Sequence, residues 1–156
     1  EHEGKVLLES LAILEWIDSR WPEPALLPPN RDAAAVVRAM AALIACDIHP
    51  LNNLRVLNRL RGSFGASEEQ VRDWIGHWVL QGSAALENLI AQHGGVFAFG
   101  DAPTLADGCV VPHVYHAERF GVDLSAFPRL LAANAKALTL TAFERARPEA
   151  QPDADA

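Results

Sequence analysis

The chain has 156 residues, of which 50% are hydrophobic and 21% charged, values typical of a globular domain that buries a core and not of a disordered or fibrous chain. Its formal net charge of −7 disfavours a nucleic-acid partner and means that an anionic ligand must be held by local positive charge. No apolar run reaches about 18 residues and no signal peptide is recognised, so no membrane-spanning helix is expected.

The first segment predicts the end of a small α/β unit. Residues 1–4 are a polar turn, and residues 5–8 (KVLL) predict a short strand that should belong to a sheet whose other strands are not in this sequence. Residues 9–20 carry apolar residues at helical spacing, with Ser10 as the candidate N-cap. Four prolines within residues 22–30 then predict a linker.

From Arg31 onward the pattern predicts a purely helical domain. Residues 32–47 form an alanine-rich helix with an apolar stripe, and helical character resumes over residues 51–61. Pro50 lies between them. Because proline lacks a backbone donor and crowds the carbonyl four residues earlier, at Cys46, a kink is expected here.

Two capping boxes introduce the next helices. Residues 67–70 (SEEQ) fit the S-x-x-Q box and precede the clearest apolar stripe in the chain, which ends at Gly94. Residues 104–107 (TLAD) open a helix to Phe120 that is apolar nearly all round, so it should be central and buried. Shorter helices are predicted over residues 127–140 and 141–147, followed by a polar tail over residues 151–156.

Cys46 and Cys109 lie in apolar, helix-like stretches without the spacing of a zinc site. This favours buried free thiols in a reducing compartment such as the cytoplasm.

The layout resembles the glutathione transferase superfamily, in which a thioredoxin-like N-terminal domain binds glutathione and a helical C-terminal domain shapes the second substrate site. Residues 9–10 (ES) and the box at residues 104–107 are similar to two elements of that superfamily. Three further segments resemble its zeta class, that of the maleylacetoacetate and maleylpyruvate isomerases. They are residues 47–57 (DIHPLNNLRVL), residues 106–112 with 117–120, and residues 151–154 (QPDA).

The resemblance covers essentially the whole chain and implies that it is the C-terminal portion of such a protein, a mainly α fold. Residues 1–21 would be the last strand and helix of the thioredoxin-like domain, the rest of which is absent from the sequence. Residues 22–30 would be the linker, residues 31–150 a bundle of about five helices, and residues 151–156 the tail.

The resemblance also implies roles for six side chains. They are Glu9 and Ser10 at the γ-glutamyl end of glutathione, His49 and Asn53 elsewhere in the glutathione site, and Arg55 and Arg119 facing an acidic substrate. The motif that stabilises the thiolate is not in this chain, so no catalytic residue and no metal site is assigned. His113 stands where glutamine is usual and Gly108 where a larger residue is common. Because of these two departures, the resemblance does not fix the shape of the substrate pocket.

Simpler interpretations of these residues exist without the resemblance. His49 beside a kink could be a cap-like or solvent-exposed residue, and Asn52 or Asn53 could cap the helix after Pro50. Arg55 could belong to a solvated face. Arg119 near a helix end would interact favourably with the helix dipole.

The implied reaction is glutathione-dependent cis–trans isomerisation of a maleyl diacid in the degradation of aromatic compounds, with glutathione as cofactor. The expected partners are glutathione and a small dicarboxylate, with a homodimer implied and neither nucleic acid nor membrane. Two alternatives stay open: another glutathione transferase activity, such as conjugation or haloacid dehalogenation, and a non-catalytic helical domain used for protein association.

Overall fold

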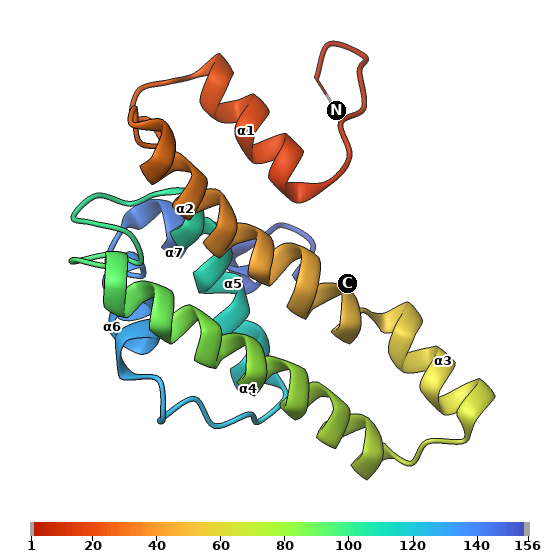
Figure 1. Ribbon diagram of the computed structural model, residues 1–156. Coiled ribbons are helices and arrows are strands. Elements are labelled where there is room, and N and C mark those ends of the chain that lie inside the picture. The colour runs from red at the N-terminus through yellow and green to blue at the C-terminus, as the bar shows by residue number, and fades with distance from the viewer. Residues whose placement is uncertain (1, 155–156) are drawn as a thin grey trace.

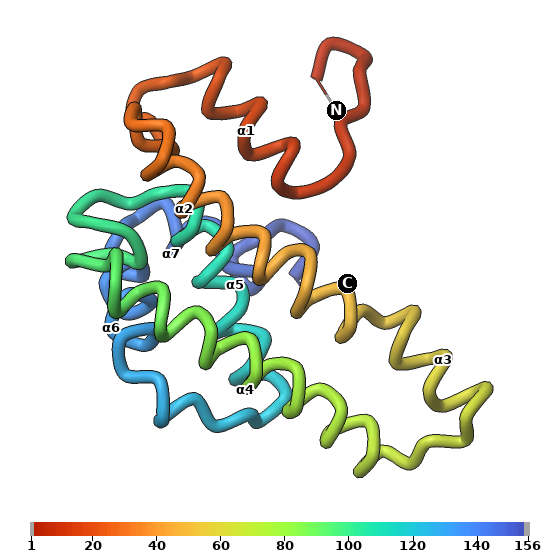
Figure 2. The backbone as a smooth tube through the Cα atoms, viewed as in Figure 1, coloured from red at the N-terminus to blue at the C-terminus, as the bar shows by residue number. Residues whose placement is uncertain are grey.

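The computed structural model describes residues 2–154, and Figures 1 and 2 show that it is a bundle of helices. The helices run in chain order as α1 (Ser10–Arg20), α2 (Arg31–Ala42), the π-helical η1 (Leu43–Ile48), the 3₁₀ turn η2 (His49–Asn52), α3 (Leu54–Phe64), α4 (Glu68–His93), α5 (Leu105–Arg119), α6 (Pro128–Ala137), α7 (Thr141–Arg145) and the 3₁₀ turn η3 (Pro148–Ala150).

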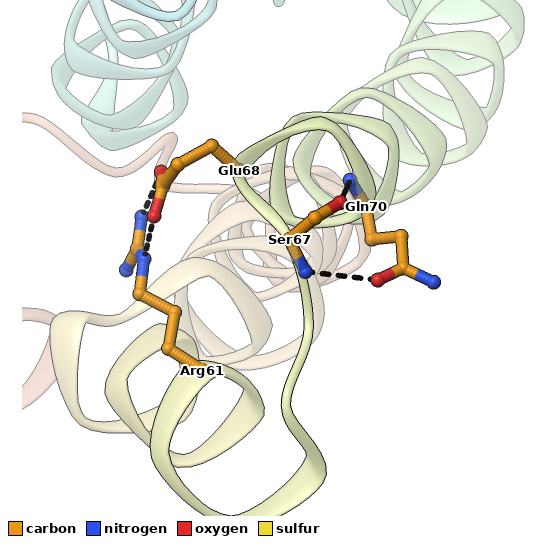
Figure 3. A network of polar contacts seen from close by, with 4 residues as sticks. All are labelled: Arg61, Ser67, Glu68 and Gln70. Carbon is orange, nitrogen blue, oxygen red and sulfur yellow. Dashed lines mark hydrogen bonds and ion pairs between the residues drawn. The ribbon is translucent and has the colours of Figure 1, made fainter.

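Capping explains where α4 begins. The Ser67 hydroxyl accepts from the Gln70 backbone N–H at 3.2 Å, and the Gln70 side chain accepts from the Ser67 N–H at 2.9 Å, which is the predicted capping box (Figure 3). Arg61 of α3 pairs with Glu68 through two contacts of 2.6 and 2.9 Å, so the end of α3 is tied to the start of α4.

The start of α5 is fixed by a buried carboxylate. Asp107 is fully buried and accepts from the Thr104 N–H at 2.8 Å and the Thr104 hydroxyl at 3.1 Å. Its second oxygen accepts from the Ala98 N–H at 2.9 Å. The predicted box at residues 104–107 is therefore confirmed, and it also ties the loop after α4 to α5.

The core surrounds α5, as its apolar sequence predicted. α5 packs against α2 and α6, while α4 packs against α6 and the π-helical segment. The largest fully buried apolar side chains come from four helical elements and the segments around Pro50: Val37, Met40, Ile44, Ile48, Val71, Ile75, Val79, Leu86, Leu105, Val110 and Leu130. The mainly α bundle is confirmed.

The N-terminal segment differs from expectation in two respects. Within residues 2–154 no strand forms, and residues 5–8 take part only in an isolated bridge between His2 and Lys5. A strand needs a neighbour to satisfy its backbone groups, and Val6 and Leu8 remain exposed. The helix begins at Ser10 with Glu9 in the N-cap position, where no side chain bonds to the helix, so Ser10 as N-cap is wrong.

The expected kink at Pro50 is a change of helix type. The His49 N–H donates to the Ile44 carbonyl, five residues back, which closes the π-helical segment. A 3₁₀ turn follows, and Asn53 then adopts an extended conformation before α3 begins. The wider turn accommodates Pro50, which has no N–H to give to Cys46.

The helical stretch Arg31–Phe64, with a mean hydropathy of 1.5 in its most apolar window, is long and apolar enough to cross a membrane by length and composition alone. Its stripe of Val37, Met40 and Ile44 is buried in the core of the bundle. That packing accounts for its hydropathy, as in the core helix of a folded domain.

Cys109 is a buried free thiol as predicted, and burial together with nearby Cys46 raises its pKa to about 11. Cys46 is also a free thiol, but it is exposed, contrary to expectation. It lies on the outer side of the π-helical segment, where the wider turn places it facing solvent beside a hollow between η1 and α4.

Candidate functional site

Three histidines gather where the π-helical and 3₁₀ segments cross α5. The ring of His49, at the start of η2, lies 5.5 Å from the ring of His116 and 5.9 Å from that of His113, measured between centroids. His113 and His116 are three residues apart on α5, so they lie on one face of that helix. We call the set His49, Asn52, Ser83, His113 and His116 the histidine layer.

One hydrogen bond joins the histidine layer to α4. The hydroxyl of Ser83, fully buried on α4, lies 2.9 Å from Nε2 of His113, which is also fully buried. Asn52 is 5% exposed and lies three residues after His49 in a 3₁₀ turn, where side chains at this spacing are eclipsed. The Asn52 side chain therefore occupies the same side of the turn as His49.

Several polar atoms of the layer have no hydrogen-bond partner among residues 2–154. They are Nε2 of His49, both polar atoms of the Asn52 amide, Nδ1 of His113 and Nε2 of His116. Buried polar groups are usually paired because an unpaired one costs about 1–3 kcal/mol. A cluster of them beside an irregular helical segment is typical of a functional site.

Burial keeps the three imidazoles neutral. Desolvation, together with His116, lowers the pKa of His49 to about 4, and desolvation, together with the other two rings, lowers the pKa of His113 to about 3. The pKa of His116 is also lowered, first by burial and then by the charge of Arg119. Arg119 lies three residues after His116 on the same face of α5, so both His49 and Arg119, two of the sequence-predicted residues, are neighbours of His116.

Arg119 is exposed at the end of α5 and borders a hollow of about 600 Å³ that the C-terminal segment completes. There the Tyr115 hydroxyl donates to Oε1 of Glu149 at 2.6 Å, which raises the pKa of Tyr115. A guanidinium at the rim of a hollow, with no ion pair to any residue from 2 to 154, can bind a carboxylate.

Asn53 and Arg55 occupy the start of α3. The Asn53 side-chain oxygen accepts from the Arg55 N–H at 3.1 Å, so Asn53 is the N-cap of α3, the simpler of the roles foreseen for it. The α-helical spacing that would place His49 and Asn53 on one face does not apply, because a 3₁₀ turn and an extended residue separate them. Arg55 is exposed, and its guanidinium makes no ion pair within the described chain.

Glu9 and Ser10 are exposed at the start of α1. α1 and α2 run antiparallel, so this end of α1 lies toward the end of α2 that leads into the π-helical segment (Figure 1). Glu15 of α1 holds Arg38 of α2 through contacts of 2.6 and 3.1 Å, which fixes the two helices. Within residues 2–154, no hydrogen bond or ion pair joins the side chain of Glu9 or Ser10 to the histidine layer.

Ser83, Asn52 and His116 were not foreseen as site residues, and His113 was foreseen only as a departure from the family. Two histidines in the middle of a helix that is otherwise apolar nearly all round were the available signal, since a buried polar group needs a reason. Within residues 2–154, no group of three or more His, Cys, Asp or Glu residues is arranged to hold a metal ion.

Comparison with known proteins identifies the family of this chain. The family model for the glutathione S-transferase C-terminal domain matches residues 55–133. The chain is 51% identical over 154 residues to a maleylacetoacetate isomerase of Pseudomonas aeruginosa, covering 99% of this chain and 71% of that protein.

Comparison with solved structures gives the same family. A holo structure of a maleyl pyruvate isomerase, described as a bacterial zeta-class glutathione S-transferase, matches with a TM-score of 0.95 at 47% identity, over 98% of this chain and 73% of that one. A maleylacetoacetate isomerase of Anaeromyxobacter dehalogenans, with dicarboxyethyl glutathione and citrate in its active site, matches with a TM-score of 0.92 at 42% identity, over 99% of this chain and 70% of that one. The chain therefore belongs to the zeta class of the glutathione S-transferase family, with the maleylacetoacetate and maleylpyruvate isomerases.

Proposed function

We propose that the protein catalyses the glutathione-dependent cis–trans isomerisation of a maleyl diacid, maleylpyruvate or maleylacetoacetate, to its fumaryl form. The observation that carries this proposal is the 51% identity with an isomerase over 99% of the chain. The local geometry supports it, because an unpaired guanidinium beside neutral imidazoles suits a dianionic substrate bound next to a peptide-like cofactor.

The residues present fit glutathione. Nε2 of His49 is buried and lacks a partner among residues 2–154, so it suits a ligand rich in amide donors and acceptors. We propose that His49 and Asn53 contact glutathione, and that Glu9 and Ser10 hold its γ-glutamyl end. The exposed amide nitrogen of Asn53 is free for this contact, since its oxygen already caps α3.

When bound, glutathione supplies a thiolate nucleophile, which makes a protein nucleophile unnecessary. Arg119 and Arg55 would hold the two carboxylates of the substrate and stabilise the negative charge that grows on it during the reaction. Guanidinium groups suit this role because they stay charged and bind carboxylates bidentately. A preorganised donor of this kind lowers the barrier by roughly 2.7–4 kcal/mol, as mutagenesis of such donors shows, which corresponds to about two to three powers of ten in rate.

The test is the glutathione-dependent loss of maleylpyruvate ultraviolet absorbance with the full-length protein and its Arg119→Ala and Arg55→Ala variants. We expect activity that requires glutathione and falls at least about a hundredfold in Arg119→Ala. Arg59→Ala is the matched control for the loss of a positive charge, because Arg59 lies one turn after Arg55 on α3 and its guanidinium lies over the Phe64 ring. No activity with maleylpyruvate or maleylacetoacetate would overturn the proposal, and turnover of haloacids instead would favour the dehalogenase alternative.

We also propose the domain division at residues 22–30, a homodimer and a cytoplasmic location. Family membership supports the first two, and the exposed free thiol of Cys46 supports a reducing compartment. Light scattering coupled to gel filtration would measure the oligomeric state, and a monomer at micromolar concentration would contradict it. Proteolytic cleavage should concentrate at the linker.

A further inference from the structure

The proposed reaction uses His49 of the histidine layer and gives no role to His113. His113 is fully buried in the middle of α5, and its Nε2 lies 2.9 Å from the Ser83 hydroxyl. A valine or leucine would fill this place without desolvating an imidazole. A buried histidine tied to a buried serine therefore needs a role beyond filling space.

Geometry connects His113 to His49. Their ring centroids are 5.9 Å apart with an interplanar angle of 36°, and His116 meets the same His49 ring at 5.5 Å and 46°. These separations are those of aromatic rings in contact. The His49 ring is thus supported by two side chains one turn apart on α5, while its backbone lies at the junction between the π-helical and 3₁₀ segments.

The Ser83 hydrogen bond restricts how His113 can support that ring. With Nε2 engaged by Ser83, the 180° ring flip that would put Cε1 in the place of Nε2 is disfavoured, and the position of Nδ1 is thereby fixed as well. A neutral imidazole has one donor and one acceptor nitrogen, so the hydrogen bond also couples the tautomer of His113 to the hydroxyl direction of Ser83. A side chain that orients another through such a bond acts in the way that outer partners orient metal-bound histidines.

We propose that His113, held by Ser83, is a positioning residue that sets the orientation of His49 and thereby the affinity for glutathione. The assignment of glutathione as the ligand of His49 rests on the proposed function, whereas the orientation of His49 by His113 and Ser83 does not. Because the pair acts through His49, it should affect glutathione binding and leave the chemical step unchanged.

The kinetic test compares Ser83→Ala, His113→Leu and His113→Gln in the full-length protein. Ser83→Ala and His113→Leu should raise the KM for glutathione about two- to tenfold, the loss expected for one hydrogen bond, with kcat within about twofold of wild type. His113→Gln, which keeps an amide able to bond Ser83, should restore most of the affinity. His77→Gln removes an exposed imidazole from the same helix as Ser83 and is the matched control.

The second readout is independent of activity. Long-range ¹H–¹⁵N spectra of the imidazoles should show His113 with a single tautomer in wild type and with averaged nitrogen shifts in Ser83→Ala. The His49 shifts should also change in Ser83→Ala and stay near those of wild type in His113→Gln. Unchanged His49 shifts together with an unchanged KM in Ser83→Ala would overturn the inference. If the wild type shows no isomerisation, the proposed function fails while the spectra still decide the positioning role. If His113→Leu does not fold, Ser83→Ala and His113→Gln decide.

Discussion

Lowering the pH from 7 to 5 should weaken the fold through the histidine layer. The pKa of His113 is lowered to about 3 and that of His49 to about 4, whereas both have ordinary values near 6.5 in an unfolded chain. The unfolded state therefore binds more protons than the folded state across this range. Stability from these groups is complete above pH 6.5 and is lost as the pH falls to about 4 for His49 and about 3 for His113.

Linkage gives the size of the effect. For His113, the difference between pH 7 and pH 5 is about 1.8 kcal/mol, because the unfolded chain becomes protonated while the folded chain does not. His49 is half-buried, so solvent screening makes the same value an upper limit for it. Together they predict a loss of about 2–4 kcal/mol, a large part of a domain's stability.

The ion-paired carboxylates Glu15 and Glu68 do not contribute to the loss of stability between pH 7 and pH 5. Arg38 lowers the pKa of Glu15, and Arg61 lowers the pKa of Glu68. Both carboxylates are therefore ionised in the folded state throughout pH 5–7, and they add to acid sensitivity only at lower pH.

Urea unfolding followed by tryptophan fluorescence at pH 7 and pH 5 measures the loss. His113→Gln should lose about 1.8 kcal/mol less than wild type between the two pH values. His77→Gln, an exposed position on α4, should lose as much as wild type. An equal loss in His113→Gln and wild type would refute the reasoning, because it would mean that His113 binds a proton in the folded state.

Three further predictions concern the supports of the site, each measured as the free energy of unfolding. Gly82→Ala would place its Cβ against the buried Ile48 side chain and should cost about 1–3 kcal/mol, whereas Gly76→Ala on the same helix has open space and should gain up to about 1 kcal/mol. Asp107→Ala removes a buried acceptor of three hydrogen bonds and should cost about 3 kcal/mol or more, while Thr104→Ser, which keeps the hydroxyl, should cost less than Asp107→Ala. Ser67→Ala should cost about 1 kcal/mol by removing the cap of α4, and no change would show that Gln70 alone suffices.

Much of the fold follows from local sequence, because caps and apolar periodicity act over a few residues. The boxes at residues 67–70 and 104–107 locate the starts of α4 and α5, and the apolar character of residues 105–119 correctly places α5 in the core. The strand at residues 5–8 could not form for a reason outside local sequence, since pairing depends on a neighbouring strand.

The site was less predictable because it depends on helix type as well as on spacing. The i, i+4 spacing of an α-helix would place His49 and Asn53 on one face. In the 3₁₀ turn, Asn52 lies on the same side as His49, and Asn53 becomes the N-cap of α3. Contacts between segments distant in sequence, such as Ser83 with His113, leave no local pattern. The resemblance assigns Arg119 to the substrate site because it compares positions and needs no geometry, and this role stays a prediction.

Pro50 links the local sequence to the arrangement of the site. Without an N–H it cannot complete an α-helical bond to Cys46, so the preceding turn widens until the His49 N–H reaches the Ile44 carbonyl. The Trp74 indole then donates to the Leu51 carbonyl at 2.9 Å, which satisfies a carbonyl released by the break and fixes the 3₁₀ turn. An unbroken α-helix would direct position 49 elsewhere. The irregular backbone thus places His49 against α5, and the buried imidazoles on α5 can orient it only because that break is fixed.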